Sequence, residues 1–136
     1  MRTLFADSGY WIAFLHTGDQ LHERARTLAA DLGSAKIVTT QMALIEVLDH
    51  LAGRGEQRRS LAVQMVRDLE ARADVEIVPQ TDAQFGAAVQ RYADRPDQTW
   101  SLTDCASFLV MEERNITEAL AYDRDFEQAG FTALLR

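Results

Sequence analysis

Cysteine is almost absent from this chain, because Cys105 is the only one among 136 residues. An internal disulfide is therefore excluded, and the chain suits a reducing compartment. Long apolar runs are also absent, which argues against a transmembrane helix. Near its start the sequence reaches a carboxylate at Asp7 before any apolar stretch builds up. We therefore expect no signal peptide, no membrane association and a cytoplasmic location.

The signatures of several enzyme classes are missing as well. The sequence has no P-loop, no G-x-G-x-x-G and no G-x-S-x-G, so these nucleotide-binding and hydrolase sites find no support. The three histidines, His16, His22 and His50, form no close pair, and the single cysteine has no cysteine partner. A zinc site is therefore not expected.

Basic residues are outnumbered, with 14 Lys and Arg against 21 Asp and Glu and a net charge of -7. Contacts to nucleic-acid phosphates normally need a basic surface, so this balance argues against such a partner. The objection is weaker if several acids hold a cation, because a bound cation reverses the local field. The densest basic stretch, residues 53–59, is either a solvated loop between helices or a phosphate contact.

The hydrophobic pattern predicts one domain, residues 1–136, in which strands and helices alternate. The expected strands are residues 3–6, 36–39, 75–78, 119–122 and 131–135. The expected helices are residues 8–15, 20–32, 42–51, 61–69, 85–92 and 102–109. Asp19 is the expected N-cap of the second, and a Thr81–Gln84 capping box is expected to open the helix that includes residues 85–92. Strands separated by helices indicate a three-layer α/β/α fold with a central, mainly parallel sheet of four to five strands.

Four acidic residues are expected at one edge of that sheet. Asp7 and Asp123 directly follow predicted strands, Asp104 opens a helix, and Glu46 lies about one turn into the helix after the second strand. Ligands of a parallel sheet bind outside the carboxyl ends of its strands, so these side chains can converge. Four neighbouring carboxylates repel one another unless a divalent cation binds them, and such oxygen ligands suit Mg²⁺ or Mn²⁺.

Each acid except one has an ordinary structural alternative. Asp7 is favoured as a helix N-cap, Asp104 completes a capping box with Ser101, and Asp123 suits a turn. Glu46 is harder to explain, because it lies between two apolar residues and ionised groups are seldom buried without a partner.

The order and spacing of these residues resemble the PIN-domain ribonucleases, and more narrowly the VapC-type toxins of bacterial toxin–antitoxin pairs. The matching segments span nearly the whole chain and are residues 5–8, 38–46, 101–104, 123–126 and 128–131. The chain departs from this pattern at Gln41, where relatives often carry Asn.

The resemblance implies a metal-dependent endoribonuclease, with Mg²⁺ or Mn²⁺ as cofactor, RNA as substrate and a VapB-like antitoxin as partner. The metal-binding and catalytic acids that it implies are Asp7, Glu46, Asp104 and Asp123. Asp125 is the alternative fourth acid, and Asp123 is favoured because it directly follows a predicted strand. Substrate-binding positions are expected at Ser8 and Thr40, which match polar positions flanking the site, and at Arg124, which stands beside the acids.

Two other functions remain open from the sequence. The first alternative to the nuclease is a catalytically silent binding module that keeps the fold. The second is an Asp-based phosphotransfer domain, which the residues around Asp7 favour less. An aromatic cluster near the start is compatible with the face of a homodimer. Its members are Tyr10, Trp11 and Phe14.

Overall fold

A five-stranded sheet runs through the middle of the computed structural model, which describes all residues from 1 to 136. The strands are β1 (Thr3–Ala6), β2 (Lys36–Thr40), β3 (Val75–Val78), β4 (Glu118–Leu120) and β5 (Thr132–Ala133). Their order is β3-β2-β1-β4-β5, and every neighbouring pair is parallel. The expected parallel sheet is therefore confirmed, and β1 is its central strand.

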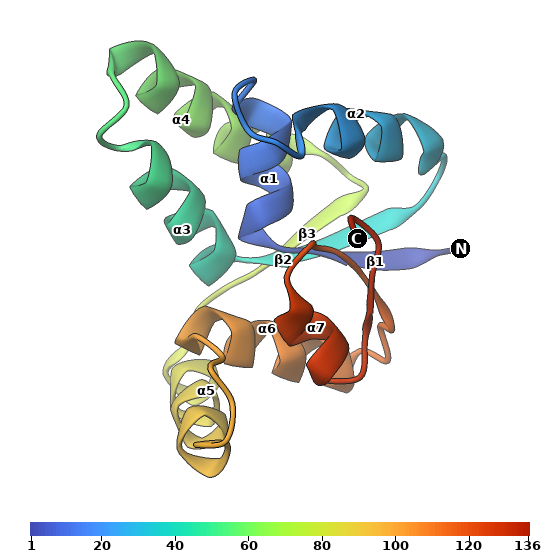
Figure 1. Cartoon of the computed structure of the whole chain (residues 1–136), viewed down its shortest axis with the longest axis vertical. Helices are drawn as coiled ribbons and strands as arrows, with labels where there is room; N and C mark the ends of the chain where they lie inside the picture. The colour runs from blue at the N-terminus through green and yellow to red at the C-terminus, as the bar shows by residue number, and fades with distance from the viewer.

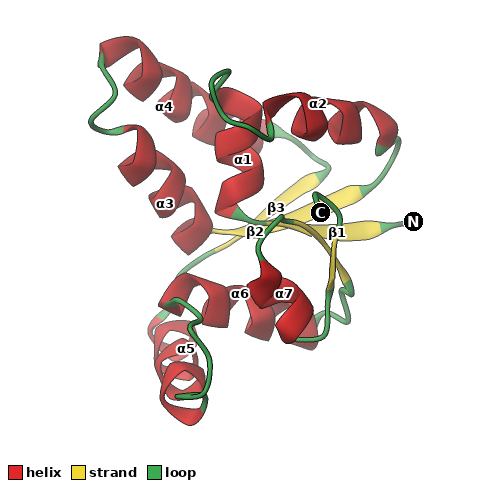
Figure 2. Cartoon of the chain, viewed as in Figure 1, coloured by secondary structure: helices red, strands yellow, loops and turns green.

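Helices cover both faces of this sheet, which confirms the three layers (Figures 1 and 2). One layer holds α1 (Ser8–Leu15), α2 (His22–Asp31), α3 (Gln41–Leu51) and α4 (Glu56–Ala71). The other holds α5 (Asp82–Asp94), α6 (Leu102–Glu113) and α7 (Arg124–Gln128). None of these helices is long and apolar enough to cross a bilayer.

The two-residue period of the strands divides the apolar side chains between two cores. Leu4 and Ala6 of β1 lie in the core under α1 to α4, whereas Phe5 lies in the core under α5 to α7. Side chains on neighbouring strands alternate in the same way. On the Phe5 side, the rings of Phe5, Phe108 and Phe126 pack together and join the sheet to α6 and α7.

Several element boundaries differ from the predicted ones. Helix α2 begins at His22, because Asp19 caps a preceding turn by accepting a hydrogen bond from the Leu21 N–H at 2.8 Å. Helix α4 begins at Glu56, directly after Gly55, whose φ of 100° is one that glycine adopts readily. The expected capping box of α5 is half present, since Thr81 accepts from the Gln84 N–H but no partner reaches Gln84 Oε1.

The proposed aromatic dimer face is wrong. Tyr10 and Trp11 are only 2% and 3% exposed, because α1 turns them into the core beneath α2 and α4. Large apolar side chains are exposed instead on α5, at Phe85, Val89 and Tyr92. These three positions have the spacing of one helix face.

Candidate metal centre

The carboxyl ends of the strands and the first turns of several helices meet at one edge of the sheet (Figure 2). Asp7 leaves the central strand β1 and occupies the N-cap position of α1. Its backbone N–H donates to the Leu120 carbonyl of β4 at 3.2 Å, which joins the ends of these two strands. Asp104 is the third residue of α6, and Asp123 is the N-cap of α7.

Asp7 does not act as a capping side chain, although it stands at the cap position. Its carboxylate is 7% exposed, and the buried Oδ1 atom has no hydrogen-bond partner. Burial raises the pKa of Asp7 to about 7; the nearby Ser8 and Gly9 N–H groups oppose this rise, and the charges of Glu46 and Asp123 add to it. An unpaired buried carboxylate oxygen is costly, so this atom needs a proton or a cation.

Asp104 completes the capping box that the sequence offered as its ordinary role, and it also lies among the other acids of the cluster. Its backbone N–H donates to Ser101 Oγ at 3.0 Å, and its Oδ2 accepts from the Ser101 N–H at 3.1 Å, which completes the capping box. Burial raises the pKa of Asp104 to about 8, with further contributions from the Asp125 side chain and from the charge of Asp7. The cap orients the carboxylate, while the neighbouring acids make its negative charge unfavourable without a cation.

Asp123 and Asp125 both belong to the cluster. Each offers a carboxylate oxygen that, together with one of Asp104, lies within 4.8 Å of the others. The expectation that Asp123 directly follows a strand is wrong, because β4 ends at Leu120. Asp123 Oδ1 instead accepts from the Asp125 N–H at 3.1 Å, so the two acids share one turn. Both Asp123 and Asp125 therefore stay candidates for the fourth acid.

Glu46 faces this edge from α3 and is held there by Ser8. The Ser8 hydroxyl donates to Glu46 Oε1 at 2.7 Å. The reason for singling out Glu46 from the sequence is weaker in the structure, since Glu46 is only half-buried and its neighbour Ile45 is 47% exposed. The acid whose burial lacks an ordinary explanation is Asp7.

The expected substrate-binding residues occupy different environments. Thr40 is 1% exposed and caps α3 by accepting from the Ala43 N–H at 3.0 Å, so its side chain serves the helix rather than a substrate. Ser8 is buried and engaged with Glu46. Arg124 is exposed at the start of α7, between the two acids of the turn.

The basic stretch of residues 53–59 lies beyond the far end of α3 and is not part of the cluster (Figure 1). Arg59 donates to the Ala52 carbonyl at 2.9 Å, and Arg58 contacts the ring of His16. These contacts favour the structural interpretation of the stretch, as a turn that joins α3 to α4.

Thr39 is a buried polar residue that the sequence reasoning overlooked. Its hydroxyl donates to the Ala6 carbonyl at 2.7 Å and accepts from Trp11 Nε1 at 3.3 Å. It therefore ties β2 to the last residue of β1 and to α1, on either side of Asp7. A threonine at a core position of a predicted strand is the sequence signal that points to such a role, because a buried hydroxyl needs partners.

The cluster suits a hard divalent cation. The grouped oxygens all come from carboxylates, and Asp7 adds a buried oxygen without a partner. Such ligands match Mg²⁺ and Mn²⁺, and a bound cation removes the mutual repulsion of the acids.

Comparison with known proteins gives consistent matches along the chain. A family model of the PIN domain matches residues 4–132. The 23S rRNA-specific endonuclease VapC20 of Mycobacterium tuberculosis, found in two strains, is 30% identical over 129 residues, which are 94% of this chain and 95% of that protein. The crystal structure of VapC20, described as a sarcin–ricin loop cleaving toxin, superposes with a TM-score of 0.84 and 27% identity. It matches 95% of this chain and 96% of that one.

Proposed function

Because this chain belongs to the PIN-domain family, we propose that it is a metal-dependent endoribonuclease of the VapC toxin type. The protein hydrolyses phosphodiester bonds in RNA, and the carboxylate cluster at the sheet edge is the reaction centre. One observation carries this proposal: oxygens of Asp104, Asp123 and Asp125 converge within 4.8 Å. Asp7, whose Oδ1 has no partner, is near enough for its charge to act on Asp104.

The residues that hold the cation are Asp7, Asp104 and Asp123, with Asp125 sharing the turn of Asp123. Mg²⁺ and Mn²⁺ both fit a set of hard oxygen ligands. When bound, the cation supplies Lewis-acid stabilisation of the negative charge that develops on the scissile phosphate.

The remaining groups of the site position the reactants. Glu46, oriented by the Ser8 hydroxyl at 2.7 Å, accepts the proton of the attacking water as general base. Arg124, exposed beside the acids, contacts a phosphate oxygen of the RNA, for which a guanidinium is well suited. The capping box fixes the Asp104 carboxylate and burial confines that of Asp7, so both would be in place to hold a cation before substrate arrives.

The proposed substrate is a structured loop of ribosomal RNA. VapC20 is named for its specificity for 23S rRNA and described as cleaving the sarcin–ricin loop. The similarity extends over almost the full length of both proteins, which makes that loop the first substrate to test. The net charge of -7 favours few phosphate contacts, concentrated at the cation and at Arg124.

A cleavage assay on the purified protein tests this function. A 5′-labelled RNA hairpin with the sarcin–ricin loop sequence is incubated with Mg²⁺ or Mn²⁺, and with EDTA. We expect cleavage at a defined site with either cation and none with EDTA. Asp7→Asn and Glu46→Gln abolish cleavage, whereas Asp49→Asn, which changes an exposed acid on the same helix as Glu46, leaves it intact.

The same assay separates the alternatives. A silent binding module binds RNA without cutting it and shows no Mn²⁺ binding that depends on Asp7. A phosphotransfer domain takes up a phosphoryl group on Asp7, which labelling with acetyl phosphate detects by mass. Either result, in a protein that fails to cut RNA, overturns the nuclease.

Two partners complete the proposal. A VapB-like antitoxin binds this toxin in the cytoplasm, and co-expression with the product of a neighbouring gene for a small DNA-binding protein tests the pair. The toxin itself forms a homodimer, and the exposed stripe of Phe85, Val89 and Tyr92 on α5 replaces the buried aromatic cluster as its candidate face.

A further inference from the structure

The side chain of Arg136 contacts two positions on either side of the acidic turn. Its Nη1 donates to the Tyr122 carbonyl at 3.2 Å, and its Nε pairs with Glu127 Oε1 at 2.8 Å. The guanidinium also lies over the Tyr122 ring, 5.2 Å from the centroid. One side chain therefore bridges the residue before Asp123 and the residue two places after Asp125.

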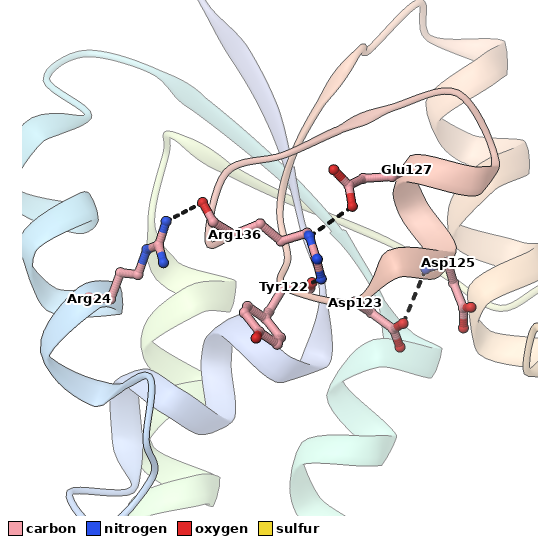
Figure 3. A network of polar contacts seen from close by, with 6 residues as sticks. All are labelled: Arg24, Tyr122, Asp123, Asp125, Glu127 and Arg136. Atoms are coloured by element: carbon pink, nitrogen blue, oxygen red, sulfur yellow. Dashed lines mark hydrogen bonds and ion pairs between the residues drawn. The ribbon is translucent and has the colours of Figure 1, made fainter.

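The bridge lies on the opposite side of the segment from the carboxylates. Figure 3 shows Glu127 directed toward Arg136, while Asp123 and Asp125 project away from it. Residues two apart on a helix point in different directions, so Asp125 and Glu127 of α7 cannot face the same way. Arg136 thus contacts the turn on the side away from Asp123 and Asp125, and it does not pair with either carboxylate.

Arg136 is itself held by the fold. The Leu135 N–H donates to the Ala121 carbonyl at 3.0 Å, and the Leu135 side chain is fully buried. On the other side, Arg24 of α2 contacts the Arg136 carbonyl oxygen (Figure 3). The Leu135 bond extends the pairing of β4 with β5 as far as Ala121, and the guanidinium adds contacts to Tyr122 and Glu127.

From this arrangement we infer that Arg136 is a positioning residue for the cation site, which it serves by fixing the Tyr122–Glu127 segment so that Asp123 and Asp125 converge on Asp104. This inference rests on the proposed function. A surface ion pair such as Arg136–Glu127 contributes little to stability. The role of Arg136 is therefore in the geometry of the turn rather than in holding the fold together.

The direction in which Arg136→Gln changes the affinity for Mn²⁺ distinguishes a positioning role of Arg136 from an effect of its charge alone. Arg136→Gln removes a positive charge near the acids, and on charge alone it tightens Mn²⁺ binding. If Arg136 positions the turn, the same change weakens Mn²⁺ binding, by about tenfold when judged from other residues that orient metal ligands.

The experiment is calorimetric titration of the full-length protein with Mn²⁺, with thermal unfolding measured on each variant. Arg136→Gln is compared with Arg136→Lys, which keeps the charge but has one donor nitrogen in place of three, and with Glu127→Gln, which removes the negative charge of the exposed partner. The matched control is Arg2→Gln, which breaks the exposed Arg2–Glu118 pair of 3.0 Å at the other end of β4.

We expect weaker Mn²⁺ binding in Arg136→Gln, partial recovery in Arg136→Lys, a smaller loss in Glu127→Gln, and wild-type binding in Arg2→Gln. The cleavage rate of Arg136→Gln returns toward that of the wild type at saturating Mn²⁺. Binding by Arg136→Gln that equals or exceeds that of the wild type overturns the inference and leaves the nuclease standing. If Asp7→Asn binds Mn²⁺ as the wild type does, the nuclease site itself is wrong, and the inference falls with it.

Discussion

Asp7 is the residue whose environment is least favourable without a ligand. Its carboxylate is buried, its Oδ1 has no partner, and Glu46 and Asp123 add negative charge nearby. An arrangement that costs free energy in the empty protein and becomes favourable with a cation is typical of functional sites.

Replacing Asp7 by asparagine therefore stabilises the cation-free protein while abolishing its activity. The amide carries no charge, so the desolvation and repulsion that act on the carboxylate disappear. In EDTA at pH 8 we expect a rise of at least about 1 kcal/mol in the free energy of unfolding, or roughly 3–5 °C in Tm. Urea and thermal unfolding measure this, with Asp49→Asn as an exposed control; a less stable Asp7→Asn contradicts it.

The cation-free protein loses stability as the pH rises. Asp7 and Asp104 have pKa values of about 7 and about 8, both above the ordinary 3.8. Between about pH 4 and about pH 8, these two carboxyl groups keep protons in the folded state that they have already released in the unfolded chain. The free energy of unfolding therefore falls as the pH rises.

Urea unfolding in EDTA at about pH 5.5 and pH 8 checks this sign. We expect lower stability at the higher pH, a smaller difference in Asp7→Asn, and recovery at the higher pH when Mn²⁺ is added. Stability that is higher at pH 8 than at pH 5.5 in the cation-free wild type contradicts the assignment.

The convergence of the acids at one edge of the sheet was predictable from the sequence, but the burial and hydrogen bonding of each acid were not. Asp7 and Asp104 stand at positions that the strand and helix patterns identify. That Glu46 is half-buried, and that Asp7 carries the unpaired oxygen, depends on the rotation of α3 and α1 against the sheet. Such a rotation follows from packing between distant elements, which local periodicity does not encode.

At the scale of elements, helix α6 joins a structural cap to the candidate metal centre, because Asp104 belongs to both. Ser101→Ala removes the cap and costs about 1 kcal/mol of stability. It also loosens the Asp104 carboxylate, so we expect weaker Mn²⁺ binding. Thr81→Ala removes the cap of α5 at a similar cost and serves as the matched control, since α5 carries none of the acids. Equal Mn²⁺ affinity in the two variants contradicts this coupling.

The hydroxyl of Thr39 adds a side-chain link between β2, the end of β1 and α1 at the site. Thr39→Val keeps the shape of the side chain but leaves the Ala6 carbonyl and Trp11 Nε1 without this partner. We expect a loss of about 1–3 kcal/mol in the free energy of unfolding. Thr132→Val, at an exposed position of β5, is the control and changes stability little. Urea unfolding of the two variants gives the comparison.

Most elements were predicted, but the short helix α7 was missed and the end of β4 was misplaced. Strands β1, β2 and β3 match their predicted residues to within one position. Helix α7 was missed because five residues, Arg124–Gln128, are too few to establish a helical period. The end of β4 was placed two residues late, since Ala121 is buried like the strand residues before it although it lies outside the ladder.

At the scale of the molecule, the exposed stripe on α5 predicts self-association. Phe85, Val89 and Tyr92 are each more than 40% exposed, and a two-fold dimer pairs the same face of both copies. We expect light scattering after size exclusion to give a dimer for the wild type and a monomer for Val89→Glu. Ile45→Glu, at another exposed apolar position, is the control; a monomeric wild type at micromolar concentration contradicts the dimer.

The fold class was predictable as a whole, because alternating strands and helices leave few topologies for a chain of this length. The order of the strands was not, since it depends on which strand ends pair across long separations in sequence. Strand β1 pairs with β4, which lies more than a hundred residues later in the chain.

The pairing of β1 with β4 has a consequence for the synthesis of the protein. Asp7 is made more than a hundred residues before Asp123 and Asp125. One side of β1 stays unpaired until β4 has been synthesised, so the acidic cluster cannot assemble earlier. The proposed nuclease is therefore inactive until the residues through Asp125 have left the ribosome.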